Sequence, residues 1–207
     1  PLDKIKTARM SILRRLDAEG LVNRSYPLED GVACPEKNYP LNPKLANPNL
    51  EIDQVVFGPE ILQFYERLLG GPVSHLGFKW VRSRNRGVGT LPHCDKVYMG
   101  RGTPRLLTGW ITYGEVPINS GPIVLLEGSH RQSERIKKYL DSDVDVYCEN
   151  RPEEVSKAHA GRLIHPGWLS KNPVSLREKF GGRWLTAHFQ PGDLLAFPMN
   201  MIHASLD

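Results

Sequence analysis

Two potential metal ligands, His93 and Asp95, stand two positions apart with Cys94 between them. Residues i and i+2 of an extended segment point to the same face, roughly 6.5 Å apart along the backbone, so both side chains can reach one ion. Cys94 then points away, and we expect it to be a small, half-buried apolar residue. Another histidine, His203, ends a strand-like stretch near the end of the chain. Two imidazoles and one carboxylate hold non-haem Fe(II) with coordination positions left open, so these residues predict an oxygenase-type iron site.

The histidine–aspartate pair alone is weak evidence, because such pairs also arise by chance. Without context, His203 is more simply explained as a core histidine beside Met201 and Ile202. Two longer segments, residues 107–130 and 190–205, supply that context. Taken together, they shift the odds toward a metal ligand.

Helical patterns dominate the first part of the chain. Apolar residues recur at helical spacing over residues 2–19, where Gly20 supplies a stop, and a second helix is predicted over residues 59–69. The intervening residues 26–59 contain several prolines, typical of irregular connecting structure. We expect the helices to buttress a core.

Beyond Gly71, short apolar, β-branched and aromatic runs separated by Gly and Pro are typical of an all-β barrel or sandwich. The predicted strands cover residues 73–84, 106–114, 123–126, 184–189, 194–197 and 201–205. A short polar helix is predicted between residues 130 and 140. Residues 141–182 form a long charged insertion, which we interpret as a lid over the site in preference to a solvated loop.

The composition indicates one soluble domain of 207 residues, with 40% hydrophobic and 24% charged residues. We expect residues 1–70 to support a β core formed by residues 71–207. No apolar run approaches the roughly 18 residues of a membrane span and no signal peptide is visible, which favours a cytoplasmic protein without membrane contact. The three cysteines are odd in number and widely spaced, so free thiols are expected. The oligomeric state is left open.

A run of cations precedes the iron motif. Arg82, Arg84 and Arg86 alternate and can share one face of an extended segment. The simpler interpretation is a solvated strand face; the alternative is a positive rim that attracts an anionic substrate, with Lys79 opposite as a pocket cation. Trp80 among these charges is compatible with nucleic-acid binding. The net charge of +4 slightly favours anionic partners without requiring nucleic acid, and no wider basic patch supports that interpretation.

A set of motifs in one order resembles the phytanoyl-CoA dioxygenase family over roughly residues 59–207. The motifs are His93-x-Asp95, the strand with Trp110, Asn119-x-Gly121-Pro122, Gly128-Ser129-His130-Arg131, Pro191-Gly192-Asp193 and His203-x-Ser205. The resemblance implies a mainly β fold, a double-stranded β-helix or cupin-like jelly roll with N-terminal buttressing helices. It also implies an enzyme that uses Fe(II), 2-oxoglutarate and O2 to hydroxylate an aliphatic C–H of a small organic substrate, releasing succinate and CO2.

The resemblance implies that His93, Asp95 and His203 are the iron ligands. Asp95 also discriminates within the wider class, since relatives that halogenate replace the carboxylate with a small residue to make room for halide. Its presence favours hydroxylation. Because the imidazoles must be neutral to bind the metal, we expect iron to be lost below roughly pH 6.

The co-substrate pocket is implied by fewer residues. Ser205 resembles the position whose hydroxyl helps to hold 2-oxoglutarate, and Trp110 and Thr112 fall on the strand that lines this pocket in relatives. The family normally places an Arg after the distal histidine to grip the far carboxylate bidentately. The sequence ends at Asp207, so we expect either a longer native chain or another cation in that role. Glu127 replaces the usual Pro before Gly-Ser-His.

Two rival interpretations remain. A non-catalytic jelly-roll module would bind metal or ligand without turning over oxygen, and the missing Arg favours it. A cupin-type metal enzyme would use water, prefer Zn2+ or Mn2+ and ignore 2-oxoglutarate, but the usual His-rich clusters are missing. Ser129 beside His130 does not indicate a hydrolase, because adjacent side chains on an extended chain point apart. The primary substrate is not indicated.

Overall fold

The computed structural model describes residues 1–37, 45–77, 79–81, 89–144 and 167–206. The chain divides into two compact units. The first comprises Pro1–Val88, Ile111–Glu115 and Gln190–Asp193; the second comprises Gly89–Trp110, Val116–Phe189 and Leu194–Asp207. That the chain works as one domain with a support region ending near residue 70 stays a prediction.

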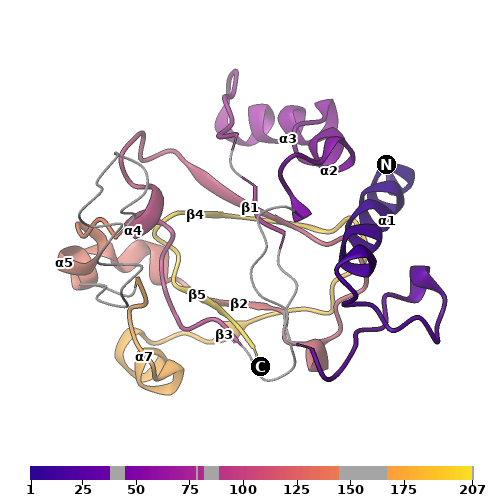
Figure 1. Ribbon diagram of the computed structural model, residues 1–207. Coiled ribbons are helices and arrows are strands. Elements are labelled where there is room, and N and C mark those ends of the chain that lie inside the picture. The colour runs from indigo at the N-terminus through magenta and orange to yellow at the C-terminus, as the bar shows by residue number, and fades with distance from the viewer. Residues whose placement is uncertain (38–44, 78, 82–88, 145–166, 207) are drawn as a thin grey trace, which may run out of the picture. The chain divides into compact units, whose positions relative to one another are not determined.

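The first unit is helical in its described part (Figure 1). Its elements are α1 (Leu2–Ala18), a 3-10 turn η1 (Leu28–Asp30), α2 (Leu50–Val56) and α3 (Pro59–Leu69). Helices α1 and α3 confirm the two predicted helices. Helix α3 begins at Pro59 and ends before Gly70, whose φ of 76° suits a left-handed cap.

Helix α2 lies in the region predicted to be irregular, and there the prediction was wrong. Asn49 caps the helix by accepting a hydrogen bond from the Ile52 N–H at 3.2 Å. The Ser11 hydroxyl of α1 donates to the same Asn49 oxygen at 3.0 Å, and Asn49 is only 1% exposed. This buried cap joins α1 to α2. The contact is long-range in the sequence, so the proline-rich sequence around α2 gives no local sign of it.

The strand predicted over residues 73–84 is also absent from the residues that the structure describes there, 73–77 and 79–81. In a strand the Lys79 carbonyl would accept from a neighbouring backbone. Instead it accepts from the Asn47 side chain at 3.1 Å, while the Lys79 ammonium pairs with Asp53. Side-chain contacts thus replace a ladder of backbone hydrogen bonds.

The second unit contains two small sheets (Figure 1). One is antiparallel, in the order β3 (Trp184–Leu185), β2 (Ile123–Leu126) and β5 (His203–Ser205); the other pairs β1 (Leu107–Ile111) with β4 (Leu194–Pro198). All five lie within predicted strands or extend them by one residue. In β2, Val124 and Leu126 are buried while Ile123 and Leu125 are partly exposed, which is the alternation expected of a sheet with one covered face.

Short helices cover the core of this unit. They are α4 (Lys96–Met99), the 3-10 segments η3 (Ile118–Ser120) and η4 (Ser129–Ile136), α5 (Lys137–Leu140) and α7 (Pro173–Phe180). Side chains from η4, α5 and α7 pack with Leu126 and Ile202 in one buried cluster. Segments η4 and α5 confirm the helix predicted between residues 130 and 140. The predicted lid falls largely on residues 145–166, which lie outside the described residues.

Antiparallel strands flanked by helices agree with the expected class in general terms, although the described strands are short. Within the described ranges, every helix is too short or too polar to span a lipid bilayer.

Candidate metal centre

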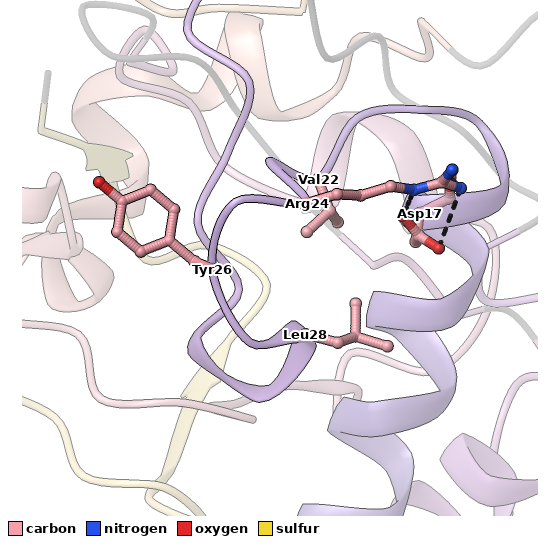
Figure 2. A pocket seen from close by; sticks show the side chains of 5 residues that line it. All are labelled: Asp17, Val22, Arg24, Tyr26 and Leu28. Atoms are coloured by element: carbon pink, nitrogen blue, oxygen red, sulfur yellow. Dashed lines mark hydrogen bonds and ion pairs between the residues drawn. The ribbon is translucent and has the colours of Figure 1, made fainter.

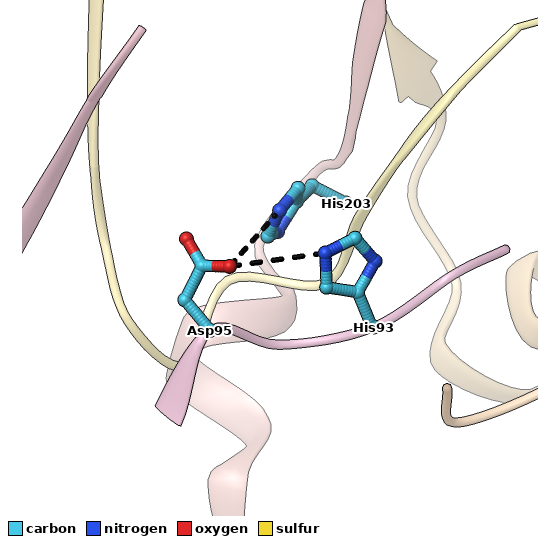
Figure 3. A group of neighbouring side chains, drawn as sticks. All are labelled: His93, Asp95 and His203. Carbon is cyan, nitrogen blue, oxygen red and sulfur yellow. Dashed lines mark ion pairs between the residues drawn. The ribbon is translucent and has the colours of Figure 1, made fainter. Parts of the chain in front are cut away.

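His93, Asp95 and His203 converge in the second unit. Asp95 Oδ1 lies 3.8 Å from His93 Nε2 and 3.5 Å from His203 Nε2, both longer than ordinary hydrogen bonds. Figure 3 shows this one carboxylate oxygen directed at both rings. The possible ligand atoms all lie within 4.8 Å of one another. In the part of the chain that the structure describes, no other group of three or more His, Cys, Asp or Glu residues is arranged to hold a metal.

Backbone pairing brings the two histidines together. The His93 N–H donates to the His203 carbonyl and the His203 N–H donates to the His93 carbonyl, each at 2.9 Å. Directly opposed residues of an antiparallel pair carry their side chains on the same face, and the ring centroids are 4.2 Å apart. On its other side, His93 bridges to Trp168. The segment that carries His93 therefore lies between β5 and the chain around Trp168.

Asp95 reaches the site in a different way from that expected. Its φ of −66° and ψ of −21° are helical, and it immediately precedes α4. The premise that the His93–Asp95 segment is extended throughout was therefore wrong, although the predicted convergence is observed. The Asp95 carbonyl accepts from the Tyr98 and Met99 N–H groups, while its carboxylate makes no capping bond to the helix. The carboxylate points to the histidines instead.

Hydrogen bonds to carbonyls orient both imidazoles. His93 Nδ1 lies 2.8 Å from the Leu91 carbonyl and His203 Nδ1 lies 3.1 Å from the Met201 carbonyl. A carbonyl can only accept, so each Nδ1 carries the proton and Nε2 carries the lone pair of the neutral ring. Both Nε2 atoms face Asp95. Metal-binding histidines are commonly held in this way, so the donor set fits a divalent transition metal.

Cys94 is not part of this donor set. It is 0% exposed and packs in the core with Leu126 and Ile202. Burial, and then the charge of Asp95, raise the pKa of its thiol, so the uncharged thiol is favoured over the thiolate that a metal requires. The sequence-based prediction that Cys94 is an apolar packing residue is confirmed, and its burial is more complete than expected.

The model of the phytanoyl-CoA dioxygenase (PhyH) family matches residues 47–207. The chain belongs to this family. No curated protein matches the chain. Family membership supports an oxygenase, and the His-Asp-His group is a candidate for its metal site.

The Gly-Ser-His turn of the phytanoyl-CoA dioxygenase motif holds the chain before His203. Ser129 Oγ accepts from the Ile202 N–H at 3.0 Å, and Ser129 is 0% exposed. The Asn200 side chain donates to the His130 carbonyl at 2.8 Å. Ser129 therefore satisfies a buried backbone donor beside the distal histidine, which gives it a structural role and agrees with the rejection of a hydrolase.

Ser205, the predicted co-substrate contact, forms a pair with Thr90. Its Oγ lies 2.6 Å from the donating Thr90 N–H and 3.0 Å from Thr90 Oγ1, while the Ser205 N–H donates to Thr90 Oγ1 at 2.8 Å. Thr90 donates both contacts at this Oγ, so the single hydroxyl proton of Ser205 is left for donation. That it contacts 2-oxoglutarate stays a prediction.

The remaining predicted pocket residues are divided between the units. Trp110 lies in the second unit with its ring edge against Phe189, the centroids 4.9 Å apart. Thr112 belongs to the first unit, where its hydroxyl donates to the Gln190 carbonyl at 2.5 Å. Lys79 also belongs to the first unit and is paired with Asp53. Roles of these residues toward the co-substrate stay predictions.

Two residues that support the site were missed. The Thr108 hydroxyl lies 2.5 Å from Asp95 Oδ2, and its position two residues before Trp110 on a predicted strand was a usable signal. Tyr139 Oη accepts from the Cys94 N–H at 3.0 Å and donates to the Gly167 carbonyl at 2.7 Å. No local pattern indicates that contact, because Tyr139 is 45 residues from Cys94.

Tyr139→Phe is expected to destabilise the protein. The change removes only the hydroxyl and leaves the Cys94 N–H and the Gly167 carbonyl without this partner, at a cost of about 1–3 kcal/mol. Urea unfolding of both proteins measures the difference. Tyr26→Phe is the matched control, because Tyr26 is 53% exposed. Equal losses in the two variants would contradict the bridging role of Tyr139.

A hollow in the first unit does not resemble a catalytic site. Figure 2 shows it lined by Asp17, Val22, Arg24, Tyr26 and Leu28. Arg24 Nε donates to Asp17 at 2.7 Å, so the charged groups of the hollow are directed at each other. The three potential metal ligands lie in the other unit.

Proposed function

We propose that this protein is an Fe(II)- and 2-oxoglutarate-dependent dioxygenase that hydroxylates an aliphatic C–H of a small organic substrate, with release of succinate and CO2. The proposal rests on the convergence of His93, Asp95 and His203, with both Nε2 atoms facing one carboxylate oxygen. Two imidazoles and one carboxylate leave coordination positions open for further ligands. Membership of the phytanoyl-CoA dioxygenase family supports the same reaction class and a double-stranded β-helix as the fold.

Each residue has a distinct part in this proposal. When bound, iron would supply the activation of oxygen and the chelation of the co-substrate. His93 and His203 would bind it through Nε2, while their Nδ1–H groups remain bonded to carbonyls and fix the rings. Asp95 would add a negative charge through Oδ1. Ser205 would donate its hydroxyl proton to a carboxylate of 2-oxoglutarate.

The environment of the three ligands supports a reaction that must exclude water. His93 and Asp95 are each 8% exposed and His203 is 6% exposed. The centroids of the Phe197 and His203 rings are 4.8 Å apart, and Phe197 is 2% exposed. A buried aromatic ring beside His203 and the low exposure of all three ligands strengthen electrostatic interactions within the site. The Asp95 carboxylate favours hydroxylation over halogenation, which would need room for a halide at this position.

An anaerobic titration tests the proposal. Fe(II) and then 2-oxoglutarate are added to the protein, and the visible charge-transfer band of the chelated oxo acid is followed. We expect a band with the unchanged protein and no band with His93→Ala. Succinate release during a substrate screen would then identify the second substrate. Iron binding without any band would contradict the use of 2-oxoglutarate.

Acid is expected to release the metal. Free imidazole titrates near pH 6.5, and a protonated ring cannot bind a metal. Since two imidazoles must be neutral at once, the affinity should fall steeply between about pH 7 and pH 5. Metal retained after dialysis at a series of pH values measures this loss. Undiminished binding at the acid end would contradict a site with two histidines.

A further inference from the structure

The two oxygens of the Asp95 carboxylate have different partners. Oδ1 faces Nε2 of His93 and of His203, at 3.8 and 3.5 Å. Oδ2 lies 2.5 Å from the Thr108 hydroxyl. An ionised carboxylate can only accept, so the Thr108 hydroxyl donates this bond, and a bond of this length to a charged acceptor is a strong one.

We propose that Thr108 is a positioning residue that presents Asp95 to the metal through a single oxygen. A carboxylate that can turn about its Cβ–Cγ bond can offer both oxygens to an ion and occupy two coordination positions. The bond from Thr108 keeps Oδ2 away from that role. Only Oδ1 is then directed at the histidines, which preserves positions for other ligands. The inference rests on the metal site of the proposed function.

The location of Thr108 suits this role. It lies on β1, which pairs with β4, and β4 carries the Phe197 ring that packs on His203. One small sheet thus contacts two of the three ligands, Asp95 through Thr108 and His203 through Phe197. Threonine is also stiff at χ1 because it is branched at Cβ, so its hydroxyl keeps its direction better than a longer polar side chain would.

Metal affinity of substituted proteins tests the proposal without using activity. Thr108→Val keeps the branched shape and removes the hydroxyl, whereas Thr108→Ser keeps the hydroxyl. Metal-free protein is titrated with Co(II), whose visible spectrum reports both affinity and coordination. In Thr108→Val we expect a changed Co(II) spectrum, because Oδ2 is free to bind the metal as well. We also expect about 10- to 100-fold weaker binding, the usual effect of losing a hydrogen bond that orients a metal ligand. Thr108→Ser should restore affinity and spectrum.

Controls separate positioning from stability. Thr7→Val removes a hydroxyl that bonds to the Asp3 carbonyl in α1, and it should leave the affinity unchanged. Urea unfolding of each metal-free variant shows whether the fold is retained, and Thr108→Ala replaces Thr108→Val if the latter fails to fold. Wild-type affinity together with a wild-type Co(II) spectrum in the variants without the hydroxyl would overturn the proposal. So would a Thr108→Ser affinity as low as that of Thr108→Val.

The titration also distinguishes this inference from the proposed function. If the unchanged protein binds Co(II), Asp95→Ala abolishes binding and Thr108→Val has no effect, only the role of Thr108 is wrong. If the unchanged protein binds no metal, the metal site itself is wrong and the role of Thr108 falls with it.

Discussion

Asp95→Ala is expected to abolish hydroxylation while leaving the fold intact. Asp95 supplies the only carboxylate of the candidate metal group, and its Oδ1 faces both imidazoles. Losing a residue that merely orients a ligand costs roughly 10- to 100-fold in affinity or activity, and losing a ligand itself should cost more. The helix that follows is retained, because Asp95 contributes to it through its backbone carbonyl and not through its carboxylate.

The measurement is oxo-acid-dependent succinate release, together with metal affinity and urea unfolding. Asp143→Ala is the control, since Asp143 pairs with Arg101 on the surface, 2.6 Å away. It should bind metal and turn over like the unchanged protein. Turnover in Asp95→Ala equal to that of the control would rule out the proposed ligand set.

Gly167→Ala should lower the free energy of unfolding by several kcal/mol and weaken metal binding. Gly167 has a φ of 81°, which costs an alanine about 1–2 kcal/mol. A Cβ there would also lie 1.7 Å from Tyr98 Oη and 2.4 Å from Tyr98 Cζ, so the whole ring would have to move. Overpacking of this kind typically costs about 1–3 kcal/mol more. The Tyr98 ring lies edge-on to His93, with centroids 6.1 Å apart, so its displacement reaches a metal ligand.

Gly70→Ala isolates the first of these two costs. Gly70 has a similar φ of 76° in the left-handed region, and a Cβ there would meet no atom within 4 Å. Urea unfolding should therefore show a clearly smaller loss for Gly70→Ala, with metal affinity unchanged. In a double-mutant cycle, Tyr98→Ala should remove most of the additional cost of Gly167→Ala. Equal losses at the two glycines would contradict the collision.

The sequence predicted the elements whose signals are local. Helices α1 and α3 show helical spacing of apolar residues and end near glycines, and the strands of the second unit are short apolar runs bounded by turns. Helix α2 was missed because its cap at Asn49 is completed by Ser11, far away in the chain. A strand was wrongly predicted around Lys79, where bonds to side chains take the place of a partner strand.

The same distinction holds at the site. Residue type and family motif identified the three ligands His93, Asp95 and His203. The helical turn that directs the Asp95 side chain was not predicted, because the His-x-Asp motif is equally compatible with a strand. Thr108 could have been found by alternation along its strand. Tyr139 could not, since its contact to Cys94 joins distant segments through a backbone N–H that any residue would supply.

The backbone bridge between His93 and Trp168 limits where segments can be exchanged when chimeras of two family members are made. The Leu169 N–H also donates to the Pro92 carbonyl at 2.7 Å, and the Tyr139 hydroxyl bonds to the Gly167 carbonyl. Residues 167–169 thus belong structurally to the metal centre, although in the sequence they continue the long charged insertion. A chimera that takes its insertion from another family member should therefore rejoin this chain before Gly167, because a later junction would replace the neighbour of His93 together with the insertion.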